Sequence, residues 1–138
     1  MKTWAIRVLE WPSIEHIGGK APWRLTKPLV VCINARLYTV PKGYCTDLAS
    51  VPRIPFVFAR YGGKANVPAI WHDWLYDGCE GRKFTRKDAD EMFLAKMEML
   101  NDPPSHLQRK MMYYAVRLFG WRGWNKDTSW KCKDADTT

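Results

Sequence analysis

The pattern of the chain changes at Val67, and this change constrains the fold more than any other feature of its 138 residues. Before it, apolar runs such as PLVVCI and RLYTV are broken by proline and glycine, which is typical of short strands. After it, apolar residues recur at helical spacing between helix start and stop signals. We therefore predict an α+β fold: a small N-terminal antiparallel β-element, an irregular loop at 41–66, and three α-helices. This single domain spans 1–125, and the polar tail 126–138 is expected to fray.

Local signals set the bounds of the first two helices. Pro68 suits a first helical position and Gly78 suits the residue past a helix end, so one helix is predicted over 68–77. The second begins at Thr85, whose hydroxyl can cap the helix together with Asp88, and Asp88 itself is expected to face solvent. The apolar stripe of this helix comprises Ala89, Met92, Phe93, the stem of Lys96, Met97 and Leu100.

The third helix begins at a capping box of Ser105 and Gln108 and ends at Gly120. Its residues interleave aromatics with arginine and lysine, a pattern that suits stacking on bases, a lipid interface or a protein partner. The alternative is an ordinary core helix whose end is covered by Trp121 and Trp124. The core face would then comprise Met111, Tyr114, Ala115 and Leu118.

The composition limits the function classes without choosing one. A net charge of +8 favours an anionic partner: a lipid surface, an acidic protein or nucleic acid. The N-terminus lacks the pattern of a signal peptide, and no run is long enough for a transmembrane segment, so we expect residence in a cytoplasm. Four scattered cysteines predict reduced thiols.

A polar pair, His72 and Asp73, interrupts the apolar helix at 68–77. Tyr76 is a surface neighbour of both residues, whereas His72 and Asp73 diverge by about 100° around the axis. On the next helix Asp90 lies at the edge of the apolar stripe. If the two helices pack antiparallel, Asp90 can accept the ring N–H of His72 and make the other ring nitrogen a better base.

Simpler interpretations stay open for the same residues. His72 and Tyr76 can be satisfied core residues, and Asp73 can fasten a loop. Asp47 and Ser50, in the run TDLASVP, commonly fold loops on themselves through bonds to backbone. A Ser50, His72, Asp90 hydrolase lacks the expected elbow sequence around Ser50, Cys79 lacks a nucleophile signature, and His16 and His106 are poorly placed for a metal phosphohydrolase.

These motifs resemble those of two known protein families. The order TDLASVP, HDWLY, KDADEMF and YYAVRLFGWRGW resembles a family of small proteins of tailed phages and prophages catalogued as a domain of unknown function. It implies a phage origin, with location in the host cytoplasm or the virion and virion proteins as partners, but no activity.

HDWLY is also similar to the H-D-x-x-Y helix of calcium-dependent secretory phospholipases, and DADEMF to their partner helix. This second resemblance implies a catalytic set of His72 as general base, Asp90 as its orienting residue and Tyr76 as a partner of Asp90. It also implies calcium as cofactor, with Asp73 and Asp47 as its ligands and Thr46 and Ser50 as loop support. The flanking cysteines and the glycine-rich calcium loop of those enzymes are absent.

The leading hypothesis is a phage-encoded, phospholipase-like hydrolase of ester or acyl bonds in lipid or cell envelope. The first alternative is a noncatalytic virion or tail accessory protein, or a host-takeover factor. The second is a basic nucleic-acid-binding module.

Overall fold

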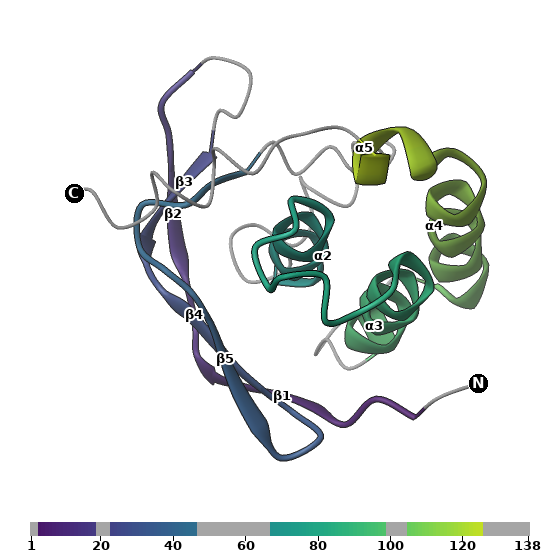
Figure 1. Cartoon of the computed structure of the whole chain (residues 1–138), viewed down its shortest axis with the longest axis horizontal. Coiled ribbons are helices and arrows are strands. Elements are labelled where there is room, and N and C mark those ends of the chain that lie inside the picture. The colour runs from purple at the N-terminus through teal and green to yellow at the C-terminus, as the bar shows by residue number, and fades with distance from the viewer. Residues whose placement is uncertain (1–2, 19–22, 47–66, 99–104, 126–138) are drawn as a thin grey trace.

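A computed structural model of the chain describes residues 3–18, 23–46, 67–98 and 105–125. Two three-stranded sheets form the N-terminal half (Figure 1). The first has the order β1-β4-β5 and the second β2-β3-β6, and every pairing is antiparallel. The strands are β1 (Ile6–Glu10), β2 (Ser13–His16), β3 (Trp23–Lys27), β4 (Leu29–Ile33), β5 (Arg36–Val40) and β6 (Cys45–Thr46).

The hairpin of β4 and β5 follows from its turn. Asn34 and Ala35 both have positive φ, at 49° and 69°, which is the backbone of the two-residue turns that match strand twist. The register places Ile33 opposite Arg36, so the turn holds two residues. The predicted antiparallel β-element is confirmed. The segment 41–66, predicted as an irregular loop, contains strand β6, because Cys45 and Thr46 pair with β3, and residues 47–66 lie outside the described part of the chain.

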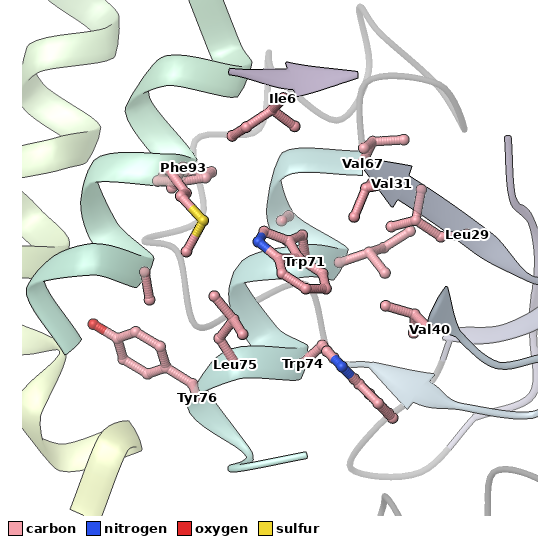
Figure 2. Packing of buried hydrophobic residues seen from close by; sticks show 14 of the residues in the cluster. Ile6, Leu29, Val31, Val40, Val67, Trp71, Trp74, Leu75, Tyr76 and Phe93 are labelled. Atoms are coloured by element: carbon pink, nitrogen blue, oxygen red, sulfur yellow. The ribbon is translucent and has the colours of Figure 1, made fainter. Parts of the chain in front are cut away.

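Helix α2 (Val67–Tyr76) is the central element of the molecule. All ten of its residues are buried, and it lies between the strands and the other helices (Figure 1). A helix that is apolar on most of its circumference is stable only when it is covered on every side. Trp71 points from α2 toward the strands that carry Val31 and Val40, whereas Tyr76 points toward the helices (Figure 2).

Helix α3 (Arg86–Glu98) packs against α2 in an antiparallel sense. Tyr76, at the end of α2, contacts Asp90, whereas His72, one turn earlier, also reaches Phe93, further along α3. The predicted stripe is buried at Ala89, Met92, Phe93, Lys96 and Met97, and Leu100 lies outside the described residues. The prediction that Asp88 faces solvent is wrong. Asp88 is buried, and it closes a capping box with Thr85.

Helix α4 (His106–Phe119) starts at the predicted capping box of Ser105 and Gln108. Its predicted core face is wrong by one position: Met112 and Val116 are buried, whereas Met111, Tyr114 and Leu118 are exposed. The face was misassigned because both sides of α4 carry apolar residues at helical spacing. The chain then continues through Gly120, in right-handed helical geometry, into the short helix α5 (Trp121–Asn125), which was not predicted.

Candidate functional site

The position of His72 on α2 is fixed by how that helix ends. Gly78 has φ +77°, and its N–H donates to the Leu75 carbonyl while the Cys79 N–H donates to Trp74. This is the Schellman arrangement, which needs a residue with positive φ and therefore favours glycine. It ends the helix one residue before the predicted boundary and turns the chain back toward α3.

His72 and Asp90 form the centre of the site. The His72 Nε2 atom lies 2.7 Å from Asp90 Oδ1, and both side chains have no exposed surface. Because a carboxylate can only accept, Nε2 carries the hydrogen and donates it to Asp90. The predicted contact between α2 and α3 is therefore present in the structure.

Three further side chains converge on Asp90. Tyr76 donates its hydroxyl to Oδ1 at 2.6 Å, and Arg117 of α4 donates to Oδ2 at 2.8 Å. Arg86, one turn earlier on α3, places a guanidinium nitrogen 3.5 Å from the same oxygen. The carboxylate thus links α2, α3 and α4 through its two oxygens.

Asp90 stays ionised in this environment. Burial alone raises the pKa of a carboxyl group, but the hydrogen bonds from His72, Tyr76 and Arg117 hold the pKa of Asp90 below its ordinary value. For Tyr76, burial and the hydrogen bond to Asp90 raise the pKa, so the phenol remains a donor. The site therefore contains a fixed negative charge beside the imidazole.

The second ring nitrogen of His72, Nδ1, is sealed from solvent. It makes no hydrogen bond within the part of the chain that the structure describes. In a neutral imidazole with its hydrogen on Nε2, Nδ1 presents an unused lone pair inside the protein. A buried polar atom of this kind is uncommon and calls for an explanation, such as a role in catalysis or a water molecule at that position.

Asp73 faces a different set of groups. Its Oδ2 accepts from the Thr46 hydroxyl at 2.6 Å and from the Tyr44 hydroxyl at 3.2 Å, and Tyr44 also contacts Asp77. Burial and the negative charges of Asp73 and Asp77 raise the pKa of Tyr44, so its hydroxyl remains protonated. His72 and Asp73 thus contact separate groups, as their angular separation predicts.

The calcium expectation depends on residues that the structure only partly describes. Asp73 and Thr46 lie together, but Asp47 and Ser50 fall outside the described residues. Within the described ranges, no three His, Cys, Asp or Glu side chains gather into a set able to hold a metal ion.

Other expectations from the sequence have clear outcomes. Cys32 and Cys45 are reduced as predicted, but Cys79 is disulfide-bonded, which contradicts the prediction that all four cysteines are reduced. His16 lies in β2, a strand rather than the irregular segment expected, and His106 begins α4. Among the described residues, no helix combines the length and the apolarity that crossing a bilayer requires.

Sequence reasoning missed Arg86, Arg117, Tyr44 and Asp77. Arg86 had a usable signal, because it lies four residues before Asp90 and opposite charges at that spacing are neighbours on a helix. Arg117 had none, since its contact requires α4 to pack on α3. Tyr44 also had none, because its contact with Asp73 joins a β-rich segment to a helix.

A surface pocket adjoins the network on its α5 side. It has a volume of about 620 Å³ and reaches the network through Arg86, which forms part of its wall. Arg82 stacks on Trp124 there, with its guanidinium carbon 3.9 Å from the ring centroid. The full lining is Arg82, Phe84, Thr85, Arg86, Trp124 and Asn125.

Comparison with known protein families gives a match over most of the chain. Residues 23–116, more than half of the chain, match a family described as "Protein of unknown function (DUF1353)". No match was found among curated proteins or among solved structures. His72, Asp73, Tyr76 and Asp90 lie inside the matched range, whereas Arg117 lies one residue beyond it.

Proposed function

The chain belongs to the DUF1353 family of proteins of unknown function, and since that family brings no activity with it, we propose from the site itself that this protein is a hydrolase of ester or acyl bonds. His72 is the general base in this proposal, Asp90 is its orienting residue, and Tyr76 positions Asp90. The observation that carries it is the asymmetry of His72: Nε2 is bonded to Asp90 at 2.7 Å, whereas the buried Nδ1 makes no hydrogen bond to any described residue.

The proposed chemistry follows from that asymmetry. A water molecule bonded to Nδ1 would pass a proton to it while its oxygen attacks a substrate carbonyl. The imidazolium that forms would be stabilised by the ionised Asp90, and it would return the proton to the departing alkoxide as the acyl carbon–oxygen bond breaks. Tyr76 and Arg117 support the step indirectly, because their bonds to Asp90 keep the carboxylate charged and aligned.

The proposed substrate is an ester of lipid or of the cell envelope. Support comes from the similarity of HDWLY and DADEMF to the helix pair of the calcium-dependent phospholipases, together with the contacts of His72 and Tyr76 with Asp90. Calcium, if used, would be held by Asp73 and Asp47 and would polarise the carbonyl.

A hydrolysis screen with a matched pair of variants tests the proposal. We expect the wild type to hydrolyse short-chain nitrophenyl esters or phospholipid vesicles, assayed with calcium and with a chelator. His72→Gln should lose about 10²–10⁴-fold in rate, because its amide can still donate to Asp90 but cannot act as a base. Tyr76→Phe keeps the base and removes only one of the bonds to Asp90, so it should lose less rate than His72→Gln.

Each variant is first shown to fold by circular dichroism and thermal unfolding. A folded His72→Gln protein that hydrolyses the substrate as fast as the wild type contradicts the role of His72. If the rate of hydrolysis is the same with calcium and with chelator, calcium takes no part in the reaction. The role of His72 as general base is unaffected by that result.

A second candidate function is noncatalytic: a virion or tail accessory protein, or a host-takeover factor. The observation that favours it is burial, since His72 and Asp90 have no exposed surface and would then serve to fasten α2 to α3. On this alternative His72→Gln destabilises the fold, and the wild type shows no hydrolysis in the screen.

Phage or prophage origin is the third part of the proposal. It is supported by the resemblance of TDLASVP and HDWLY to proteins of tailed phages. Sequencing the DNA on both sides of the gene tests it, and we expect genes for virion or lysis proteins as neighbours. A gene surrounded only by host metabolic genes would contradict this origin.

A further inference from the structure

The pocket beside α5 has an excess of positive charge at its wall. Its lining contains two arginines, Arg82 and Arg86, and no acidic residue. Arg86 shares the Asp90 carboxylate with Arg117, so one negative charge there faces two guanidinium groups. Arg82 forms no ion pair with any acidic residue in the described ranges. The pocket therefore attracts an anionic ligand.

Arg82 is held in a fixed orientation. Its guanidinium stacks on Trp124, with the guanidinium carbon 3.9 Å from the ring centroid, and its Nη2 donates to the Trp124 carbonyl at 3.0 Å. The other N–H groups of Arg82 make no hydrogen bond to a described residue, so they are available to a ligand. A guanidinium that is already fixed loses less conformational entropy on binding than a mobile surface arginine does.

The backbone at Arg82 is unusual for an arginine. Its φ of +59° lies in the left-handed region, directly after Gly81 at φ +66°. Glycine and asparagine adopt this conformation more readily than a long side chain does. Residues held in such conformations are concentrated at ligand-binding and catalytic sites. This position therefore favours a function for the Arg82 side chain over a role in forming the turn.

The remaining donors favour a phosphate group over a carboxylate. The Thr85 hydroxyl accepts from the Asp88 N–H, which leaves its own hydrogen for a ligand, and the exposed Asn125 adds an amide. These donors approach from two segments, the start of α3 and the end of α5. A carboxylate has two oxygens in one plane and is satisfied by a single arginine fork, whereas a phosphate group offers three oxygens in a tetrahedral arrangement.

The size of the pocket and its apolar wall indicate an organic phosphate. The volume of about 620 Å³ lies within the usual range for pockets that hold small organic molecules, about 300–1,000 Å³. Phe84 and Trp124 contribute aromatic surface to the wall. An inorganic phosphate ion would leave this surface uncovered, whereas a ligand with an apolar part next to its phosphate would bury it.

We infer that this pocket binds an organic phosphate monoester. The two arginines would neutralise the phosphate charge, the hydroxyl and amide groups would donate to its oxygens, and the aromatic wall would cover the organic part. The inference rests on the pocket and holds whether or not His72 is catalytic. Two sources offer the same chemistry, a soluble phosphate ester and the headgroup of phosphatidic acid, and the experiment below distinguishes them.

Phenyl phosphate serves as the probe, because it joins a phosphate monoester to one flat apolar ring. We expect the full chain to bind it in isothermal titration calorimetry. Benzoate, which carries a carboxylate on the same ring, should bind about tenfold more weakly or not at all. Inorganic phosphate should also bind more weakly, since it leaves the aromatic wall exposed. Equal affinities for benzoate and phenyl phosphate would contradict the assignment of phosphate.

Three variants locate the binding site. Arg82→Gln should lower the affinity for phenyl phosphate about tenfold or more, because it removes a charge and the guanidinium fork. Asn125→Asp adds a negative charge to the wall but keeps the stack of Arg82 on Trp124, so a comparable loss is expected even if Arg82→Gln does not fold. Arg36→Gln is the control, since it removes the same charge from β5, far from α5 (Figure 1).

The control variant should bind phenyl phosphate as tightly as the wild type, and circular dichroism with thermal unfolding checks that each variant folds. Three results would overturn the inference. The first is no binding of phenyl phosphate, and the second is binding that a folded Arg82→Gln or Asn125→Asp protein retains in full. The third is an equal loss of affinity in Arg36→Gln, which would assign the binding to net charge alone.

Two further probes identify the source of the phosphate. Adenosine 5′-monophosphate represents a soluble ester, and phosphatidylcholine vesicles with added phosphatidic acid represent a membrane. Binding of the nucleotide that Arg82→Gln weakens supports a soluble ligand. Binding to the vesicles that requires phosphatidic acid and is weakened by Arg82→Gln supports a lipid headgroup.

Discussion

Replacing Asp90 with alanine is expected to lower the free energy of unfolding by about 3–5 kcal/mol, the range for removing one partner of a buried ion pair. The carboxylate has no exposed surface and accepts hydrogen bonds from His72, Tyr76 and Arg117. Without it, those donors lose their acceptor, and the guanidinium of Arg117 remains partly buried without its counter-charge. Urea unfolding followed by tryptophan fluorescence measures the loss.

Asp88→Ala is the matched control for this prediction. Asp88 lies on the same helix and is also buried, but its bond to the Thr85 N–H closes a capping box. Its loss should cost about 1 kcal/mol, the usual value for a helix cap. If Asp90→Ala costs no more than Asp88→Ala, the carboxylate does not hold the three helices together.

The acid dependence of stability provides an independent measurement on the same residue. The pKa of Asp90 in the folded protein lies below the ordinary value of 3.8 that applies when it is unfolded. Its contribution is therefore complete above pH 3.8 and is lost as the pH falls through the lower, folded-state pKa. The difference in unfolding free energy between wild type and Asp90→Asn should shrink as the pH falls below 3.8, and a constant difference would contradict this.

The parts of the fold that depend on local chemistry were predictable. Gly78 ends α2 because its positive φ suits glycine, and Ser105 begins α4 because its hydroxyl caps the helix. Asp90 was assigned to the buried side of α3 from its angular position alone. Once both helices and the turn between them were predicted, the contact of His72 with Asp90 followed from their packing.

The parts that depend on long-range packing were not predictable. Helix α4 has apolar residues on two faces, so its pattern did not show whether Met112 or Met111 faces the core. The pairing of β6 with β3 and the bond of Arg117 to Asp90 join segments far apart in the sequence. Sequence signals that span one or two helical turns therefore identified His72 and Asp90 at the centre of the site. They did not identify the groups that surround this pair.

Replacing Gly120 with alanine is expected to lower the free energy of unfolding by about 1–3 kcal/mol, the usual cost of overpacking. Gly120 has φ −68°, a conformation in which alanine would ordinarily stabilise the protein. A Cβ atom there would, however, lie 2.4 Å from the Val116 carbonyl oxygen and 2.5 Å from the Tyr76 hydroxyl. Relief of the second contact would displace Tyr76 from Asp90, so a stability loss here reports on the site.

A double-mutant cycle with Tyr76→Phe separates the two contacts. Removing the hydroxyl relieves one of them and leaves the Val116 contact, so Gly120→Ala should cost less in the Tyr76→Phe background than in the wild type. Gly81→Ala is the control, because Gly81 has φ +66° but open space around its would-be Cβ atom. Its penalty comes from the backbone alone and should be the same in both backgrounds. If Gly120→Ala costs the same free energy of unfolding in both backgrounds, the position of the Tyr76 hydroxyl does not depend on the close approach of Gly120.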